Sequence, residues 1–240
     1  MLSLPTSAPT LQANLHALHE RITKAARAAG RDPSSVRLLA VSKAFPATVI
    51  AEAARAGQRA FGENYVQEAL AKMDELANSA DRPLEWHFIG PIQSNKTRAI
   101  AQAFDWVQSV DRLKIAERLA EQRPADLPLL NVLLQVNVSG EASKAGVAPD
   151  QLSQLAAAVA HLPRLRLRGL MAIPAPETDV ERQRLAFART NKLFRQLRAE
   201  GLKVDVLSMG MSDDLEAAIA EGSTMVRIGT AIFGARVPSR

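Results

Sequence analysis

The feature that most constrains this chain is a regular alternation of strand-like and helix-like segments. Eight short apolar segments stand between residues 36 and 228, and a helix-like segment follows each of the first seven. Strict alternation implies parallel strands, because each helix returns the chain to the starting edge of the sheet. Eight such units in about 200 residues predict an α/β fold, the (β/α)8 TIM barrel. The expected strands are 36–41, 59–61, 85–89, 104–110, 129–138, 165–172, 204–208 and 224–228.

One further helix precedes the first strand. Apolar residues at three- and four-residue spacing predict a helix over about 11–29, which would cover the bottom or side of the barrel. We expect a single domain over residues 1–240, with the barrel at about 36–234. A doubly wound open sheet is the alternative, but no Gly-x-Gly-x-x-Gly opens the first strand-to-helix turn.

Composition excludes several classes of protein. The chain has no cysteine, which rules out disulfides and thiolate sites, and its four histidines lack metal-site spacing. No apolar run is long enough to span a bilayer, and residues 1–10 lack the features of a signal peptide, so we expect a cytoplasmic protein. The net charge of +5 is dispersed and aromatic residues make up only 4%, so we expect no nucleic-acid partner.

Lys43 ends the first strand, at a place where a cation is unusual. In a (β/α)8 barrel the carboxyl ends of the strands form the working face. Burial there would lower the pKa of the amine and make it a nucleophile. The alternative is a solvated lysine in an ordinary strand-to-helix loop. Asn64, Ile89 and Met171 stand at the ends of other strands, and the alternative role for Asn64 is that of a turn residue.

The loops after the last two strands have the features of an anion site. Barrels often bind phosphate there, and glycine lets the backbone approach an anion closely. Asp213 with Glu216 reads as a capping box turned away from that ligand. Arg227 would either donate to a ligand or form a buried ion pair with an acid such as Glu63 or Asp111. The candidate anion-binding residues are Ser208, Met209, Gly210, Gly229 and Thr230.

A reactive lysine and a phosphate cradle on one barrel mouth suggest a bound aldehyde phosphate, and pyridoxal 5′-phosphate (PLP) has both groups. His87, between two aromatic residues, is better explained as a core histidine. Lys144, in a polar loop, is expected to be solvated.

Six motifs stand out along the chain: 39–43 (LAVSK), 61–65 (FGENY), 86–96 (WHFIGPIQSNK), 168–174 (RGLMAIP), 207–214 (LSMGMSDD) and 225–234 (MVRIGTAIFG). They resemble those of the pyridoxal phosphate homeostasis proteins (the YggS/PROSC family), from about residue 12 to 236. The resemblance implies a barrel similar to that of alanine racemase, in which Lys43 carries PLP as an internal aldimine. It also implies that Arg227 faces the pyridine nitrogen, that the loop residues above hold the phosphate, and that Asn64, Ile89 and Met171 line the ring. Some members have a second lysine two residues after the first, where this chain has Phe45.

Binding without efficient catalysis is the function that we expect, in intracellular PLP homeostasis. A racemase needs acid or base groups on both faces of its substrate, and this chain has one tyrosine, Tyr65. A cation at the pyridine nitrogen also weakens the electron sink that carbanion chemistry requires. We therefore assign no catalytic residue. The alternatives are a small PLP-dependent racemase or lyase, and a cofactor-free Schiff-base aldolase. Apo forms of PLP-dependent enzymes are candidate recipients, and we expect a monomer.

Overall fold

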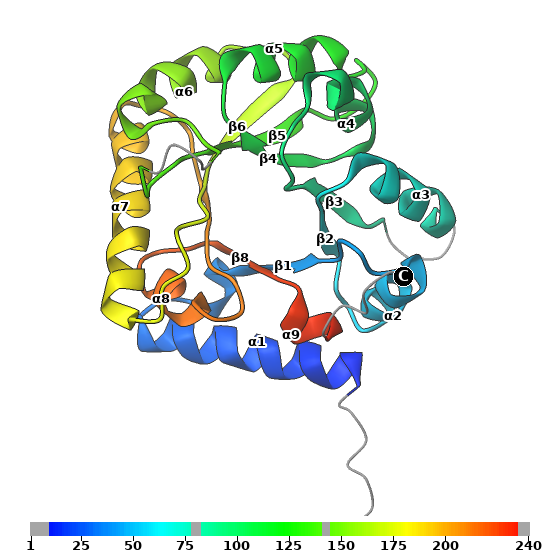
Figure 1. Ribbon diagram of the computed structural model, residues 1–240, viewed down its shortest axis with the longest axis vertical. Coiled ribbons are helices and arrows are strands. Elements are labelled where there is room, and N and C mark those ends of the chain that lie inside the picture. The colour runs from blue at the N-terminus through cyan, green and yellow to red at the C-terminus, as the bar shows by residue number, and fades with distance from the viewer. Residues whose placement is uncertain (1–9, 78–82, 141–144, 235–240) are drawn as a thin grey trace, which may run out of the picture.

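The chain folds into one closed barrel of parallel strands. The computed structural model describes residues 10–77, 83–140 and 145–234. Each strand pairs with its neighbours in sequence, and β8 closes on β1 with Leu39 opposite Arg227. The barrel expected from the sequence is confirmed, and helices surround it (Figure 1). The strands are β1 (Arg37–Val41), β2 (Ala60–Glu63), β3 (Glu85–Phe88), β4 (Trp106–Val110), β5 (Leu130–Gln135), β6 (Leu165–Met171), β7 (Val206–Ser208) and β8 (Met225–Ile228).

The outer helices alternate with the strands as the pattern predicted. Three short 3-10 turns, at Pro33–Ser35, Ser94–Lys96 and Pro149–Gln151, precede β1, α4 and α6. No clear helix was expected after the last strand, but the structure has a short one there, α9. The helices are α1 (Leu11–Ala28), α2 (Ala47–Arg55), α3 (Val66–Leu76), α4 (Thr97–Ala103), α5 (Leu113–Gln122), α6 (Leu152–Ala160), α7 (Val180–Ala199), α8 (Leu215–Ala220) and α9 (Thr230–Phe233).

The N-terminal helix α1 lies against the side of the barrel, across α8 and α9 (Figure 1). The Thr10 side chain accepts a hydrogen bond from the Ala13 N–H and so caps the helix. Its buried face is the apolar stripe that predicted it, Leu15, Leu18, Ile22 and Ala26. The helix therefore seals the junction between the end of the barrel and its beginning.

The expected capping box at α8 is wrong. The helix begins at Leu215 with Asp214 at the cap position, and the Asp214 carboxylate accepts from the Met211 N–H instead. Glu216 is bound by the Arg21 guanidinium of α1 through two hydrogen bonds of 2.8 Å. A partner 195 residues away in the sequence thus overrides the local motif.

The core has two layers. The larger one lies between the strands and the surrounding helices, and a smaller cluster fills the barrel interior. Interior side chains make the barrel a packed core rather than a pore. No helix in the described part of the chain is long and apolar enough to cross a bilayer. The interior cluster contains Leu39, Ala60, Trp106, Leu133, Met171, Val206 and Met225, with Ile89 packed against it.

Candidate functional site at the barrel mouth

A pocket of about 550 Å³ opens at the carboxyl ends of the strands. Its volume lies within the range of small-molecule sites. The structure brings together there residues that are far apart in the sequence and that the motifs had singled out. Of the predicted residues, Lys43, Asn64, Ile89, Arg227, Gly229 and Thr230 line it.

Lys43 follows β1 and is half-buried at the edge of this pocket. The residues on both sides of it are held in place. Next to it, Ala44 has a φ of 64°, which is unusual for a residue with a side chain. Its N–H donates to Glu68 Oε1 at 2.6 Å, and the Ser42 hydroxyl donates to Glu63 Oε1 at 2.6 Å.

A buried charge cluster beneath Lys43 provides these contacts. Lys72 Nζ donates to Glu63 Oε1 at 2.8 Å and to the Ser42 carbonyl at 2.9 Å, and it also pairs with Glu68. Burial raises the pKa of the Glu63 carboxyl, although hydrogen bonds from Lys72 and Ser42 offset part of the rise. The cluster fixes the backbone that presents Lys43 to the pocket.

Arg227 lies on β8 and is 5% exposed. Its guanidinium donates to Ser208 Oγ and to the Ala172 carbonyl, each at 2.8 Å. Burial lowers the pKa of Arg227 to about 10, and the charge of Asp214 offsets part of the fall, so the side chain is cationic at neutral pH. A buried cation without an ion-paired carboxylate is costly unless something else compensates it.

The structure does not support the buried ion pair that was the alternative role for Arg227. Glu63 is paired with Lys72, and Asp111 with Arg112. Among the described residues, no carboxylate lies within ion-pairing distance of Arg227. A second polar atom in the pocket lining is also uncompensated, because the Asn64 side-chain oxygen is buried without a hydrogen-bond partner in the described structure.

Four of the predicted residues lie behind the pocket wall rather than on it. Met171 belongs to the interior apolar cluster, and Met209 is fully buried in the outer core. The Gly210 carbonyl accepts from the Arg227 N–H at 3.0 Å, and Gly210 has a φ of 96° that favours glycine. The Ser208 hydroxyl is also engaged, since it accepts from Arg227 and donates to Gln108 at 2.7 Å. The contact of these residues with a ligand stays a prediction.

Gly229 and Thr230 form the part of the rim that follows β8. A Cβ on Gly229 would stand 3.1 Å from the Val41 carbonyl oxygen, so a side chain there would crowd β1. Thr230 is exposed and opens α9. The two residues leave backbone and hydroxyl groups accessible beside Lys43, as an anion would need.

Sequence reasoning missed Lys72 and Gln108. Lys72 stands on the buried face of α3, at helical spacing from Ala69 and Leu76, with Glu68 four residues before it. A charged pair on an apolar face could have been read as a buried ion pair. Gln108 is a polar residue on β4, whose residues are all buried. Its position could have indicated a polar network, although not the partners.

Comparison with known proteins decides the family. Residues 13–237 match the family model of the alanine racemase N-terminal domain. The chain is 65% identical to the pyridoxal phosphate homeostasis protein of Pseudomonas aeruginosa, over 95% of this chain and 96% of that protein. The chain belongs to the pyridoxal phosphate homeostasis protein family.

Solved structures place this family member among similar folds. PipY of Synechococcus elongatus, solved with PLP bound, has a TM-score of 0.82 and 37% identity, with coverage of 94% of this chain and all of that one. Alanine racemase of Corynebacterium glutamicum has a TM-score of 0.65 at 22% identity, and the match spans 92% of this chain and 61% of the racemase. The racemase similarity shows the shared barrel alone.

This family member carries Phe45 two residues after Lys43. The Phe45 ring packs on Phe233 of α9, with ring centroids 4.9 Å apart. An aromatic contact thus links the first and last loops of the barrel at this position. Lys144 lies outside the described residues.

Proposed function

We propose that the mouth pocket holds PLP on Lys43 and that the protein acts as a PLP carrier in cofactor homeostasis. The observation that carries the proposal is the buried Arg227 cation, which faces the same pocket as Lys43. An electron-rich ligand would compensate this cation, and the lysine amine would capture an aldehyde. When bound, the cofactor supplies that aldehyde, which condenses with an amine with loss of water. The PLP-bound structure of PipY supports the choice of ligand.

The residues of the pocket fit this group. Arg227 supplies a fixed guanidinium, and Gly229 and Thr230 supply the exposed backbone and hydroxyl groups that a phosphate favours. Asn64 brings a buried polar side chain whose oxygen is still uncompensated. Ile89 packs against the apolar interior cluster and gives the pocket an apolar contact for an aromatic ring. Each of these groups would bind and orient the cofactor.

The pocket is poor in groups that could move a proton. The single tyrosine, Tyr65, is 60% exposed and lines a neighbouring hollow instead of the pocket with Lys43. The histidine nearest to the barrel interior, His87, is fully buried below the mouth. Besides Lys43, the lining offers Asp213 as a proton acceptor, and Arg227 is a donor. We infer that efficient racemisation or lyase chemistry is not the role of this protein.

Titration of the purified protein with PLP, pyridoxal and pyridoxamine 5′-phosphate tests the binding. We expect PLP to bind most tightly, because pyridoxal lacks the phosphate and pyridoxamine phosphate lacks the aldehyde. A visible absorption band should form with the two aldehydes only. Equal affinity for PLP and pyridoxal, or no band with PLP, would contradict the proposal.

A panel of L- and D-amino acids tests the absence of efficient catalysis. We expect turnover by the loaded protein to stay near that of free PLP. Turnover well above free PLP that is lost in Lys43→Ala would establish the racemase or lyase alternative.

We propose apo PLP-dependent enzymes as recipients of the cofactor and a monomer as the carrier. Transfer is measured by mixing the loaded protein with an apo enzyme, directly and across a dialysis membrane. Faster reactivation on direct mixing would establish delivery by contact, and equal rates would establish buffering. Light scattering gives the oligomeric state, for which we expect the mass of one chain, 25.9 kDa.

A further inference from the structure

A chain of hydrogen-bonded polar side chains runs through the barrel interior from the mouth to the opposite end. Below Arg227 and Ser208, the Gln108 side chain accepts from Ser208 Oγ through Oε1. Gln108 Nε2 lies 2.9 Å from His87 Nδ1, and His87 Nε2 lies 2.7 Å from Glu85 Oε1. Ser208, Gln108 and His87 are all fully buried. Most polar groups buried this deeply in a core are hydrogen-bonded, and each of these three side chains is.

The direction of each hydrogen bond in this chain of side chains follows from Glu85, the residue farthest from the mouth. Glu85 is a carboxylate bound also by Arg37 at 2.7 Å, so it accepts, and His87 Nε2 must carry the proton. Burial lowers the pKa of His87, so the ring is neutral and Nδ1 is an acceptor. Gln108 therefore turns its amide N–H to His87 and its carbonyl oxygen to Ser208.

The consequence at the mouth concerns the hydroxyl of Ser208. Its proton is committed to Gln108, so the oxygen presents a lone pair to Arg227 at 2.8 Å. If Gln108 were reversed or absent, the hydroxyl could rotate its proton toward the guanidinium, which would repel it. The Ala172 carbonyl holds the other nitrogen of Arg227, so these two acceptors together define the plane of the guanidinium.

We propose that Gln108 is a positioning residue that acts through Ser208 to hold Arg227 in its ligand-binding orientation. The inference rests on the proposed function, because it assigns Arg227 to the PLP pocket. Gln108 does not line that pocket, so its effect on the cofactor passes through Arg227. In this proposal the Ser208 hydroxyl orients Arg227 and does not bind the phosphate.

The test is a double-mutant cycle between Gln108 and Arg227, with the dissociation constant for PLP as the readout. Gln108→Met keeps the length of the side chain and removes its hydrogen bonds. We expect it to raise the dissociation constant about fivefold to tenfold, the effect of about one lost hydrogen bond. In an Arg227→Met background the same change should have no further effect.

Gln58→Met is the matched control. Gln58 is also a buried glutamine with two hydrogen bonds, to the carbonyl oxygens of Leu38 and Ala60, but it has no link to Arg227. We expect it to lower the melting temperature and to leave the dissociation constant within about twofold of the wild type. A general loosening of the core would instead weaken binding in both variants.

Ser208→Ala provides a second measurement, which carries the test if Gln108→Met does not fold. It removes the hydroxyl that links Gln108 to Arg227. Its effect on the dissociation constant should therefore match that of Gln108→Met and also vanish in the Arg227→Met background. An unchanged dissociation constant in a folded Ser208→Ala or Gln108→Met protein would overturn the proposal, as would effects that add to that of Arg227→Met. A normal dissociation constant in Arg227→Met alone would instead overturn the proposed site.

Discussion

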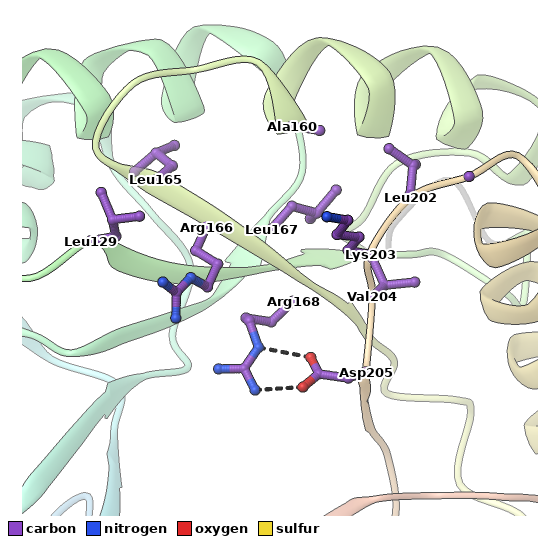
Figure 2. Close-up of a pocket in the computed structure, with 11 residues that line it drawn as sticks. Leu129, Ala160, Leu165, Arg166, Leu167, Arg168, Leu202, Lys203, Val204 and Asp205 are labelled. Carbon is purple, nitrogen blue, oxygen red and sulfur yellow. Dashed lines mark hydrogen bonds and ion pairs between the residues drawn. The ribbon is translucent and has the colours of Figure 1, made fainter.

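The two ends of the barrel each have a hollow with a central arginine, Arg168 at one end and Arg227 at the other, and the partners of these two arginines differ. The hollow at the amino-terminal ends of the strands, which we call the base of the barrel, is the larger. Its volume is about 710 Å³, against about 550 Å³ at the mouth. Figure 2 shows its central feature, Arg168 in a two-point contact with Asp205, where both bonds are 2.7 Å long. Arg168 also lies over the Trp106 ring, 4.8 Å from its centre.

We infer from the difference that the state of the charges is a better guide to the ligand site than the size of a hollow, and it favours the proposed site at the mouth. At the base, Arg168 is satisfied by partners within the protein, and its hydrogen bond to Asp205 raises its pKa. At the mouth, Arg227 is more deeply buried and has hydrogen bonds but no ion pair among the described residues. The first arrangement stabilises the fold, and the second costs stability until a ligand binds.

Removal of a lysine at each end should give the largest contrast. Lys43→Ala removes the amine that captures the aldehyde, so we expect the dissociation constant for PLP to rise about a hundredfold or more. Lys203→Ala removes an exposed lysine of the base hollow and should leave it unchanged. Absorption titration measures both. Equal losses in the two variants would show that the mouth is not the site.

Removal of the two arginines should give effects of opposite sign on stability. Arg227→Met should weaken PLP binding by about tenfold to a hundredfold, because it removes charge-assisted hydrogen bonding. The same change relieves a buried charge, so the ligand-free protein should melt about 2–4 °C higher. Arg168→Met should melt about 2–4 °C lower and bind PLP normally. Calorimetry of both ligand-free variants would refute the comparison if Arg227→Met were the less stable.

Loss of one rim hydroxyl should have a smaller effect on binding. Thr230→Val keeps the shape of the side chain and removes a donor from the anion-binding edge of the pocket. We expect a rise in the dissociation constant for PLP of about tenfold, and no change for pyridoxal, which has no phosphate. An equal loss for both ligands would place Thr230 away from the phosphate.

The stability of the protein at acid pH should depend on Glu85, at the amino-terminal end of the barrel, and not on the residues of the mouth. Burial raises the pKa of Glu85, but the hydrogen bonds from His87 and Arg37 and the charge of Arg37 lower it further, to about 2. Because this folded pKa lies below the ordinary value of 4.5, the stabilisation is complete above pH 4.5 and is lost as the pH falls toward 2. Glu85→Gln should flatten the acid part of a plot of melting temperature against pH. The same change at exposed Glu20 should retain the wild-type slope.

The barrel and the mouth could be predicted because both follow from local pattern and topology. Alternation of apolar segments and helices specifies parallel strands, and a closed barrel brings all their carboxyl ends to one rim. Lys43, Asn64, Arg227 and Thr230 could therefore be assigned to one pocket without any knowledge of contacts. The boundaries of the elements differ by a few residues, as helix and strand ends are set by capping contacts.

The polar interior could not be predicted, because its partners lie far apart in the sequence. Ser208 and Gln108 are separated by 100 residues, and nothing local indicates that the serine hydroxyl turns inward. Glu216 illustrates the same limit, since Arg21 on the first helix determines its role. Local patterns identify the position of a polar residue, whereas its partner depends on the register of the closed barrel.

Reduction of the PLP-loaded protein with borohydride, followed by peptide mapping with mass spectrometry, tests the central claim most directly. Borohydride makes a lysine–PLP link permanent, so the modified residue can be located. We predict one major modified peptide, with the cofactor on Lys43 at the mouth. Modification chiefly at Lys203 at the base, or at Lys72 beneath the pocket, would contradict the assignment of the site.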